Sequence, residues 1–287
     1  MNRTVLVVGA TGHQGGAVVE ALGKTDFHVR AMVRDMTTNE AKALQTRGVE
    51  TVLANLDEYK SLADAMDGAY GAFSMLNFMD GGVEKEEERG KRVADAAKEA
   101  GLQHFIYSSV GGADRNSGVP HFESKWHVEQ YIRELGLPHS IVRPTTFMTN
   151  MMESAAASRF IAFSMMHRES ERKPIQMIAV QDIGKWVAHM FLNREKFLYK
   201  AVEIAGDEVD FGKVMAAYKK VYGKTPTPPE SSQAQTPATQ RPWPSADFEK
   251  MFKWITTYGY EADLETNRRE IPDLLTYEQF IALKKPL

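Results

Sequence analysis

Residues 4–22 read TVLVVGATGHQGGAVVEAL and fix the class of fold. A valine-rich apolar run leads into three spaced glycines, and an amphipathic segment follows them. Strand, glycine turn and helix in this order are typical of a dinucleotide-binding α/β unit. We expect Gly9 to permit the tight turn, Gly12 to let the backbone approach a pyrophosphate, and Gly15 to let the helix pack closely. The N–H groups at such a helix start favour phosphate.

The same rhythm of strand and helix continues to about residue 143. Short runs rich in Val, Ile, Phe and Tyr, bounded by Gly, Pro or polar residues, predict strands at 4–9, 28–34, 51–54, 71–76, 104–109 and 139–144. Helical segments separate them. This alternation predicts a Rossmann-type, doubly wound parallel sheet that is covered on both faces, in the α/β class.

One of these helices, over residues 84–101, begins with a run of acids. Glu84, Glu86, Glu87 and Glu88 precede Lys91 and Arg92. Early acids and later bases suit the helix dipole and form pairs at helical spacing. We therefore interpret the run as a solvated helix face without a catalytic role.

After Pro144 the pattern is looser. It predicts helices over 146–160, 181–193 (capped near Asp182), 211–223, 248–260 and 276–284, with strands at 175–180 and 202–206. The proline-rich stretch 225–244 has no periodicity and is typical of a mobile surface loop or a binding lid. We expect a nucleotide-binding Rossmann domain over 1–150 and a smaller variable α/β lobe for substrate or partner over 151–287, partly interleaved with it.

Composition excludes several classes of function. The net charge of −3 provides no basic field for nucleic acid or anionic lipid. The chain has no cysteine, which excludes disulfides and Cys-based zinc sites and suits a cytoplasmic protein. The histidines follow no HExxH pattern and no apolar run reaches the length of a membrane span, so we expect neither a metal site nor a membrane partner.

The end of the second strand, HVRAMVRD (28–35), bears on the choice of dinucleotide. NAD sites commonly hold the ribose hydroxyls with an acid at this position, whereas NADP sites supply an arginine for the 2′-phosphate. Alignment of the strands places Val33 where the acid would stand and Arg34 next to it. A count of about twenty residues from the glycines reaches Asp35 instead, which is also a common turn residue. We favour NADP(H), with Arg34 on its phosphate.

Another stretch, VPHFESKWHVEQY (119–131), places His121 and Lys125 four residues apart at a helix start. Val128, Tyr131, Ile132 and Leu135 repeat at helical spacing and mark the buried face of this helix. Lys125 falls on the flank of that face and His121 near its middle, so both point toward the protein body.

The glycine spacing and the helix-borne lysine resemble the short-chain dehydrogenase/reductase superfamily. The set GATGHQGG, VRAMVRD, SSVGGADRNSGVPHFESKWHVE and RPTTFM is most similar to its atypical NmrA-like branch, which includes NADP-sensing regulators and isoflavone- and quinone-reductase-like enzymes. The resemblance implies pyrophosphate contacts from Thr11, Gly12, His13 and Gln14, a 2′-phosphate contact from Arg34, Phe147 near the nicotinamide, and Lys125 on the nicotinamide ribose.

Two positions depart from the family pattern. Ala54-Asn55-Leu56 replaces a frequent Gly-Asp-Leu, which puts the adenine contact of Asn55 in doubt, and His121 replaces the usual tyrosine. Hydride reduction needs a proton, and histidine can donate one near neutral pH. Other candidate donors are Tyr107, Ser108 and Ser109 at the end of the fifth strand, where a serine often holds the substrate oxygen. The position at the strand end favours Ser109, and Tyr107 is expected in the core.

Two functions follow from these features. The first is an NADPH-dependent reductase of a small molecule, namely a carbonyl, quinone, imine or activated alkene, with Lys125, His121 and Ser109 at its centre. The second is a non-enzymatic NADP(H) sensor that acts through a regulatory protein partner, which the missing tyrosine and the proline-rich stretch motivate. The sequence leaves substrate and oligomeric state open.

Overall fold

The computed structural model describes residues 3–151, 173–223 and 245–284. The chain folds into two compact units with interleaved segments. The first unit comprises 1–116, 120–143 and 180–202, and the second comprises 117–119, 144–179 and 203–287.

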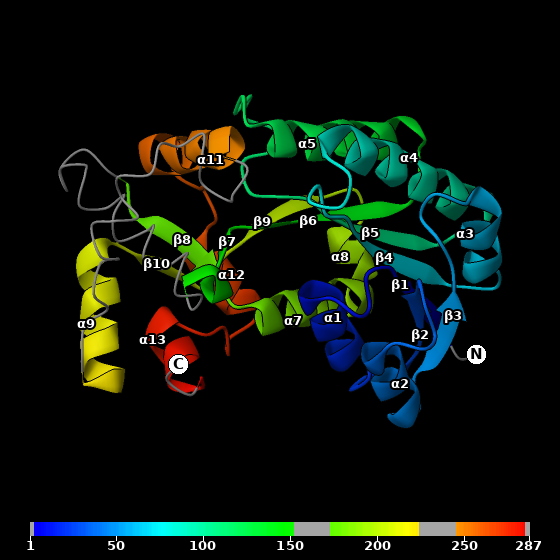
Figure 1. Ribbon diagram of the computed structural model, residues 1–287, viewed down its shortest axis with the longest axis horizontal. Coiled ribbons are helices and arrows are strands. Elements are labelled where there is room, and N and C mark those ends of the chain that lie inside the picture. Colours follow the sequence, from blue (N-terminus) through cyan, green and yellow to red (C-terminus); the bar gives the residue numbers. More distant parts are fainter. Residues whose placement is uncertain (1–2, 152–172, 224–244, 285–287) are drawn as a thin grey trace. The chain divides into compact units, whose positions relative to one another are not determined.

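The frame of the first unit is a parallel sheet in the order β3-β2-β1-β4-β5-β6-β9 (Figure 1). Its strands are β1 (Arg3–Val7), β2 (Phe27–Val33), β3 (Glu50–Leu53), β4 (Gly71–Met75), β5 (His104–Ser108), β6 (His139–Pro144) and β9 (Ala201–Ile204). The order reverses between β1 and β4, which pair directly, Val7 opposite Phe73. The predicted Rossmann-type sheet is confirmed, and every strand expected between residues 4 and 144 is present.

Helices cover both faces of this sheet (Figure 1). One face carries α1 (His13–Leu22), α2 (Asn39–Thr46) and α7 (Val180–Leu192), and the other carries α3 (Tyr59–Met66), α4 (Val83–Glu99) and α5 (Pro120–Glu134). A short helix, α8 (Arg194–Phe197), precedes β9. Alternate strand residues such as Leu6, Ala72 and Phe105 are fully buried and belong to the core beneath α3, α4 and α5.

The second unit holds a small mixed sheet. β8 (Ile175–Ile178) runs antiparallel to β10 (Asp207–Val209) and parallel to β7 (Thr146–Phe147). Its helices are the 3₁₀ turn η1 (Met148–Met151), α9 (Phe211–Tyr222), α11 (Ser245–Tyr258), α12 (Leu264–Glu270) and α13 (Tyr277–Ala282). Side-chain caps from Asp210, Asp263 and Thr276 fix the starts of α9, α12 and α13. In the described ranges no helix is long and apolar enough to span a membrane.

The helix predicted over 146–160 is wrong where it begins. Thr146 and Phe147 form strand β7, because a β-branched and an aromatic residue pair readily with β8, and Met148–Met151 form a 3₁₀ turn. Residues 152–160 and the whole proline-rich stretch, 225–244, lie outside the described residues. Helix α7 begins at Val180, so Asp182 lies in its first turn rather than at its cap.

Candidate functional site

The glycine turn after β1 has the geometry that the sequence predicts. Gly9 adopts φ +77°, a conformation that residues with a Cβ rarely adopt. A Cβ on Gly15 would lie 2.1 Å from the carbonyl oxygen of Gly9, so only glycine allows the helix to approach the turn this closely. Met75, at the end of β4, contacts the same turn: its Cε would be 3.4 Å from a Cβ on Gly9.

The start of α1 presents backbone N–H groups to solvent. Gly12 is the N-cap residue and provides no side-chain cap, and the first turn contains no acid. The helical bonds begin with the Gly16 N–H donating to Gly12 O, so the preceding N–H groups have no intrahelical acceptor. Thr11, Gly12 and His13 are exposed. This helix end suits a phosphate, through its N–H groups and the positive end of its dipole.

Gln14 is held from the neighbouring strand end. Ser108, the last residue of β5, donates from Oγ to Gln14 Oε1 at 2.8 Å. The next residue, Ser109, is 5% exposed, and among the described residues its Oγ has no hydrogen-bond partner. Tyr107 is buried, and burial raises the pKa of its hydroxyl well above the ordinary value, so it stays neutral at physiological pH.

Arg34 and Asp35, at the end of β2, have different hydrogen-bond partners. The Arg34 side chain is 72% exposed and its Nη1 donates to Asp80 Oδ2 at 2.9 Å. Asp35 instead accepts two 2.7 Å hydrogen bonds, from the backbone N–H and the hydroxyl of Thr37. These bonds lower the pKa of Asp35 and turn its carboxylate into the following loop. Both side chains are exposed, and the printed bonds of Asp35 engage only Oδ1, so both residues are accessible to a ligand.

Asn55, after β3, is engaged in a local turn. Its Oδ1 accepts from the Asp57 N–H at 3.0 Å, and its own N–H donates to the Ser61 hydroxyl at 2.9 Å. The following Asp57 accepts two bonds from Arg89, which hold the pKa of Asp57 well below its usual range.

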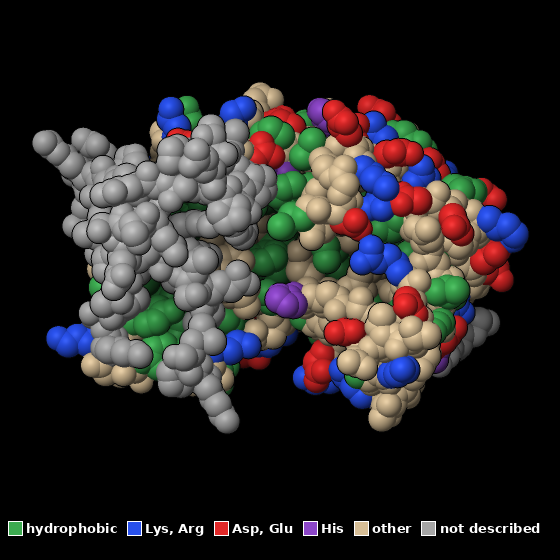
Figure 2. Space-filling view, in the orientation of Figure 1, with side chains coloured by type: hydrophobic (Ala, Val, Ile, Leu, Met, Phe, Trp, Pro, Cys, Tyr) green, Lys and Arg blue, Asp and Glu red, His purple; other side chains and the backbone are tan. Residues whose placement is uncertain are grey.

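Figure 2 shows Lys, Arg, Asp and Glu side chains intermixed over α3 and α4 rather than segregated by sign.

His121 and Lys125, on the first turns of α5, both face the loop after β4. His121 contacts aromatic rings there, whereas Lys125 contacts polar groups. The His121 ring is buried, stacks on Phe78 at 4.5 Å and meets Phe122 edge-on at 5.1 Å. Lys125 Nζ donates to Leu76 O at 3.1 Å and to Glu86 Oε1 at 2.8 Å. The structure thus brings both residues to the sheet edge where β4 ends.

Glu86 is the residue that the sequence interpretation misses. It is 1% exposed, in contrast to the solvated position expected for the whole acidic run, whereas Glu84 and Glu88 are exposed as expected. The signal lies in helix phase, since Glu86 is spaced by four, seven and eleven residues from Gly90, Val93 and Ala97, which are all buried. A residue on that phase faces the core, whatever the charge of its neighbours.

The C-terminal edge of the first sheet therefore collects most of the predicted site residues. Because parallel strands end at one edge, the glycine turn, Arg34, Asn55 and Ser109 follow β1, β2, β3 and β5, and Lys125 and His121 meet the loop after β4. Phe147 belongs to β7 in the second unit, where it is half-buried opposite Ile178, and its place near the nicotinamide stays a prediction.

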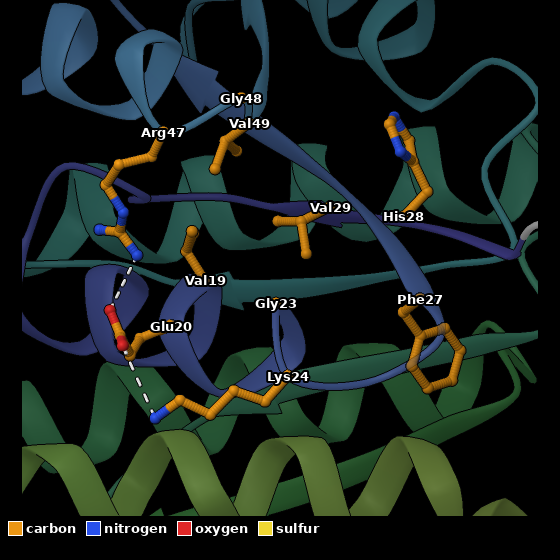
Figure 3. Close-up of a pocket in the computed structure, with 10 residues that line it drawn as sticks. All are labelled: Val19, Glu20, Gly23, Lys24, Phe27, His28, Val29, Arg47, Gly48 and Val49. Atoms are coloured by element: carbon orange, nitrogen blue, oxygen red, sulfur yellow. Dashed lines mark hydrogen bonds and ion pairs between the residues drawn. The ribbon is translucent and has the colours of Figure 1, made fainter.

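A pocket at the C-terminal end of α1 lies away from the glycine turn, at the edge of the sheet where the strands begin (Figure 3). It has a volume of about 330 Å³ and is lined by Val19, Val29 and Val49 among others. Arg47 and Lys24 both turn toward Glu20, at 2.8 and 3.6 Å. Its charged groups thus pair with one another, and it is not part of the glycine edge.

This edge and the parallel sheet define a Rossmann-type α/β protein. The chain belongs to the NmrA-like family, whose model matches residues 1–281, so the predicted family is confirmed. The NmrA-like family domain-containing oxidoreductase malD of Malbranchea aurantiaca is 30% identical over 249 residues, 77% of this chain and 74% of that protein.

Two solved structures share the fold. The NADPH-dependent quinone oxidoreductase QOR2 of Escherichia coli, complexed with NADPH, has a TM-score of 0.79 and 21% identity, covering 97% of this chain and 98% of that one. Nmra, a negative transcriptional regulator in complex with NADP, has a TM-score of 0.77 and 21% identity, covering 98% and 95%. The fold is therefore shared with an enzyme and with a regulator.

Proposed function

We propose that the chain is an NADPH-dependent reductase of a carbonyl, quinone, imine or activated alkene. The observation that carries the proposal is one sheet edge with an uncapped helix start after Gly12, an exposed Arg34 and the ammonium of Lys125. The helix start suits the pyrophosphate, Arg34 suits the 2′-phosphate, and Lys125 suits the hydroxyls of the nicotinamide ribose. They follow the sheet edge in the same order as these parts follow one another in the dinucleotide.

The residues present fit NADP(H) rather than NAD(H). Thr11, Gly12, His13 and Gln14 would hold the pyrophosphate at the start of α1, and Arg34 would pair with the 2′-phosphate. Asp35 is exposed as well, with Oδ1 bonded to Thr37, so the choice of NADP(H) rests on the guanidinium of Arg34 beside it. When bound, the nicotinamide supplies the hydride.

The chain's own residues have three tasks in this proposal. Lys125 holds the nicotinamide ribose, Ser109 holds the substrate oxygen through its buried Oγ, and His121 or water gives the proton that the reduced oxygen, nitrogen or carbon takes up. The test is NADPH oxidation by purified protein across a panel of quinones, aldehydes, ketones, imines and activated alkenes. Absence of oxidation across the whole panel would refute a reductase.

A second candidate is an NADP(H) sensor that acts through a protein partner. The packing of the His121 ring between Phe78 and Phe122 favours it, because a histidine used for packing leaves the position of the family tyrosine without an evident acid. A sensor should bind NADP⁺ and NADPH with different affinities and capture its partner with one form only. Partner capture that is indifferent to the cofactor would exclude this function.

A further inference from the structure

Glu86 is a buried carboxylate that the proposed reaction does not use. It lies in the first turn of α4 and its side chain is 0% exposed, while that of Glu87 next to it is 26% exposed. A buried charge persists in a folded protein only when it is paired and hydrogen-bonded. The identity of its partners therefore indicates what this carboxylate is for.

Both oxygens of Glu86 are bonded to consecutive residues of α5. Ser124 Oγ donates to Oε2 at 2.7 Å and Lys125 Nζ donates to Oε1 at 2.8 Å. The same ammonium donates to Leu76 O at 3.1 Å and lies 6.0 Å from the centre of the Tyr107 ring. An ammonium has three N–H donors, so two are engaged within the protein and one remains.

The contact follows from the close approach of α4 and α5. A Cβ on Gly90 would lie 2.6 Å from Val128 Cγ2, so glycine is needed where these helices meet. Glu86 is one helical turn before Gly90 and shares its face, which directs the carboxylate at α5. The pair of Glu86 and Lys125 is thus set by two packed helices and not by a loop.

We propose that Glu86 is a positioning residue for Lys125: it fixes the ammonium so that its remaining N–H is directed to the nicotinamide ribose. Ser124 holds the second carboxylate oxygen and so fixes the direction of the first. The inference rests on the proposed binding of NADP(H), and Glu86 itself touches no cofactor in it.

The test compares two ligands in the variant Glu86→Gln, which keeps the shape of the side chain and removes its charge. NADPH contains the nicotinamide ribose, whereas 2′,5′-ADP contains only the adenosine half with its phosphates. We expect Glu86→Gln to weaken NADPH binding about tenfold, as for loss of a charged hydrogen bond, and to change 2′,5′-ADP binding less than about twofold, measured by calorimetry.

Two further variants separate positioning from stability. Glu87→Gln removes the neighbouring carboxylate, which pairs with Lys91 and His127, and should leave both affinities unchanged. In the background Lys125→Met, Glu86→Gln should cause no further loss of NADPH affinity, because the residue it positions is gone. Melting temperatures show that each variant is folded.

The proposal is overturned if folded Glu86→Gln binds NADPH like the wild type, or if it loses both ligands equally. If Glu86→Gln does not fold, Ser124→Ala decides: a loss of about threefold for NADPH alone supports the proposal, and no loss refutes it. Failure of NADP(H) binding looks different, because the wild type would then bind neither ligand. Failure of the reductase alone also looks different, because the wild type would then bind NADPH without oxidising it.

Discussion

At the scale of single residues, His121 and Lys125 share a spacing but not a chemistry. The sequence predicts that both face the protein body, and both do. Their partners differ, since His121 packs against phenyl rings and Lys125 pairs with a carboxylate. Helix phase predicts the direction of a side chain, but the groups it meets come from Phe78 and Glu86, about forty residues earlier, and no local pattern contains them.

His121 gives a direct test of the proton source. We expect His121→Phe to keep NADPH affinity within about twofold and to lower turnover by about 10²-fold or more, because a phenyl ring preserves the stack on Phe78 but has no proton to give. Steady-state kinetics on an accepted substrate provides the measurement, and His121→Tyr, which restores the family residue, is the matched variant. Unchanged turnover in His121→Phe would assign the proton to water.

A buried histidine predicts acid sensitivity. His104 is fully buried, bonds Ser140 Oγ at 2.8 Å, and burial lowers its pKa to about 3. The unfolded chain takes up this proton below about pH 6.5, whereas the folded protein does not until about pH 3. The contribution of His104 to the free energy of unfolding is therefore greatest above about pH 6.5. It decreases by up to about 1.4 kcal/mol per pH unit as the pH falls from about 6.5 to about 3.

Urea unfolding at about pH 7 and about pH 5 measures that slope. In His104→Gln the decrease between the two pH values should be smaller by about one proton's contribution, whatever the variant's stability at pH 7. Equal decreases in wild type and His104→Gln would show that His104 is not the responsible group.

At the scale of elements, the glycine turn offers a matched pair of substitutions. Gly15→Ala places a Cβ 2.1 Å from Gly9 O, whereas Gly16→Ala meets its nearest atom, Ala10 O, at 3.6 Å. We expect Gly15→Ala to destabilise the protein by about 1–3 kcal/mol or more and Gly16→Ala to be neutral or stabilising by up to about 1 kcal/mol. Thermal unfolding of the two variants compares them, and similar melting temperatures would contradict this geometry.

We expect the loop after β4 to weaken cofactor binding through Asp80. Asp80 pairs with Arg34 at 2.9 Å, with side chains 54% and 72% exposed, so a 2′-phosphate must compete with a weak surface pair. We expect Asp80→Asn to tighten NADPH binding about two- to fivefold at low salt and to leave NADH unchanged. The same substitution in Arg34→Ala should have no effect, and a gain there would contradict competition for Arg34.

Elements of the Rossmann half are predictable because each has a strong local signal. Buried parallel strands are continuous apolar runs and their turns contain glycine, as β1 and Gly9 illustrate. Short elements are not, and the strand β10 (Asp207–Val209) and the helix α8 (Arg194–Phe197) are absent from the prediction. A three-residue strand gains its stability from the pairing of Val209 with Ile175, which is a tertiary contact and leaves no period in the sequence.

At the scale of the whole molecule, chain order and spatial order differ. Residues 180–202 return to the first unit after the chain has entered the second. The contact that secures α7 is between Gly184 and α1, where a Cβ would lie 2.2 Å from Ala17 O. A single glycine within a helix gives no indication of its distant partner, so the sequence predicts that the units are interleaved but not where.

The central claim is that the edge of the first sheet binds NADP(H), with Arg34 selecting the 2′-phosphate. The dissociation constants of NADPH and NADH, measured for the wild type and for Arg34→Ala, test it most directly. We predict that the wild type binds NADPH at least about tenfold more tightly than NADH, and that Arg34→Ala abolishes this preference without weakening NADH. Equal affinities in the wild type, or a preference that survives Arg34→Ala, would contradict the account.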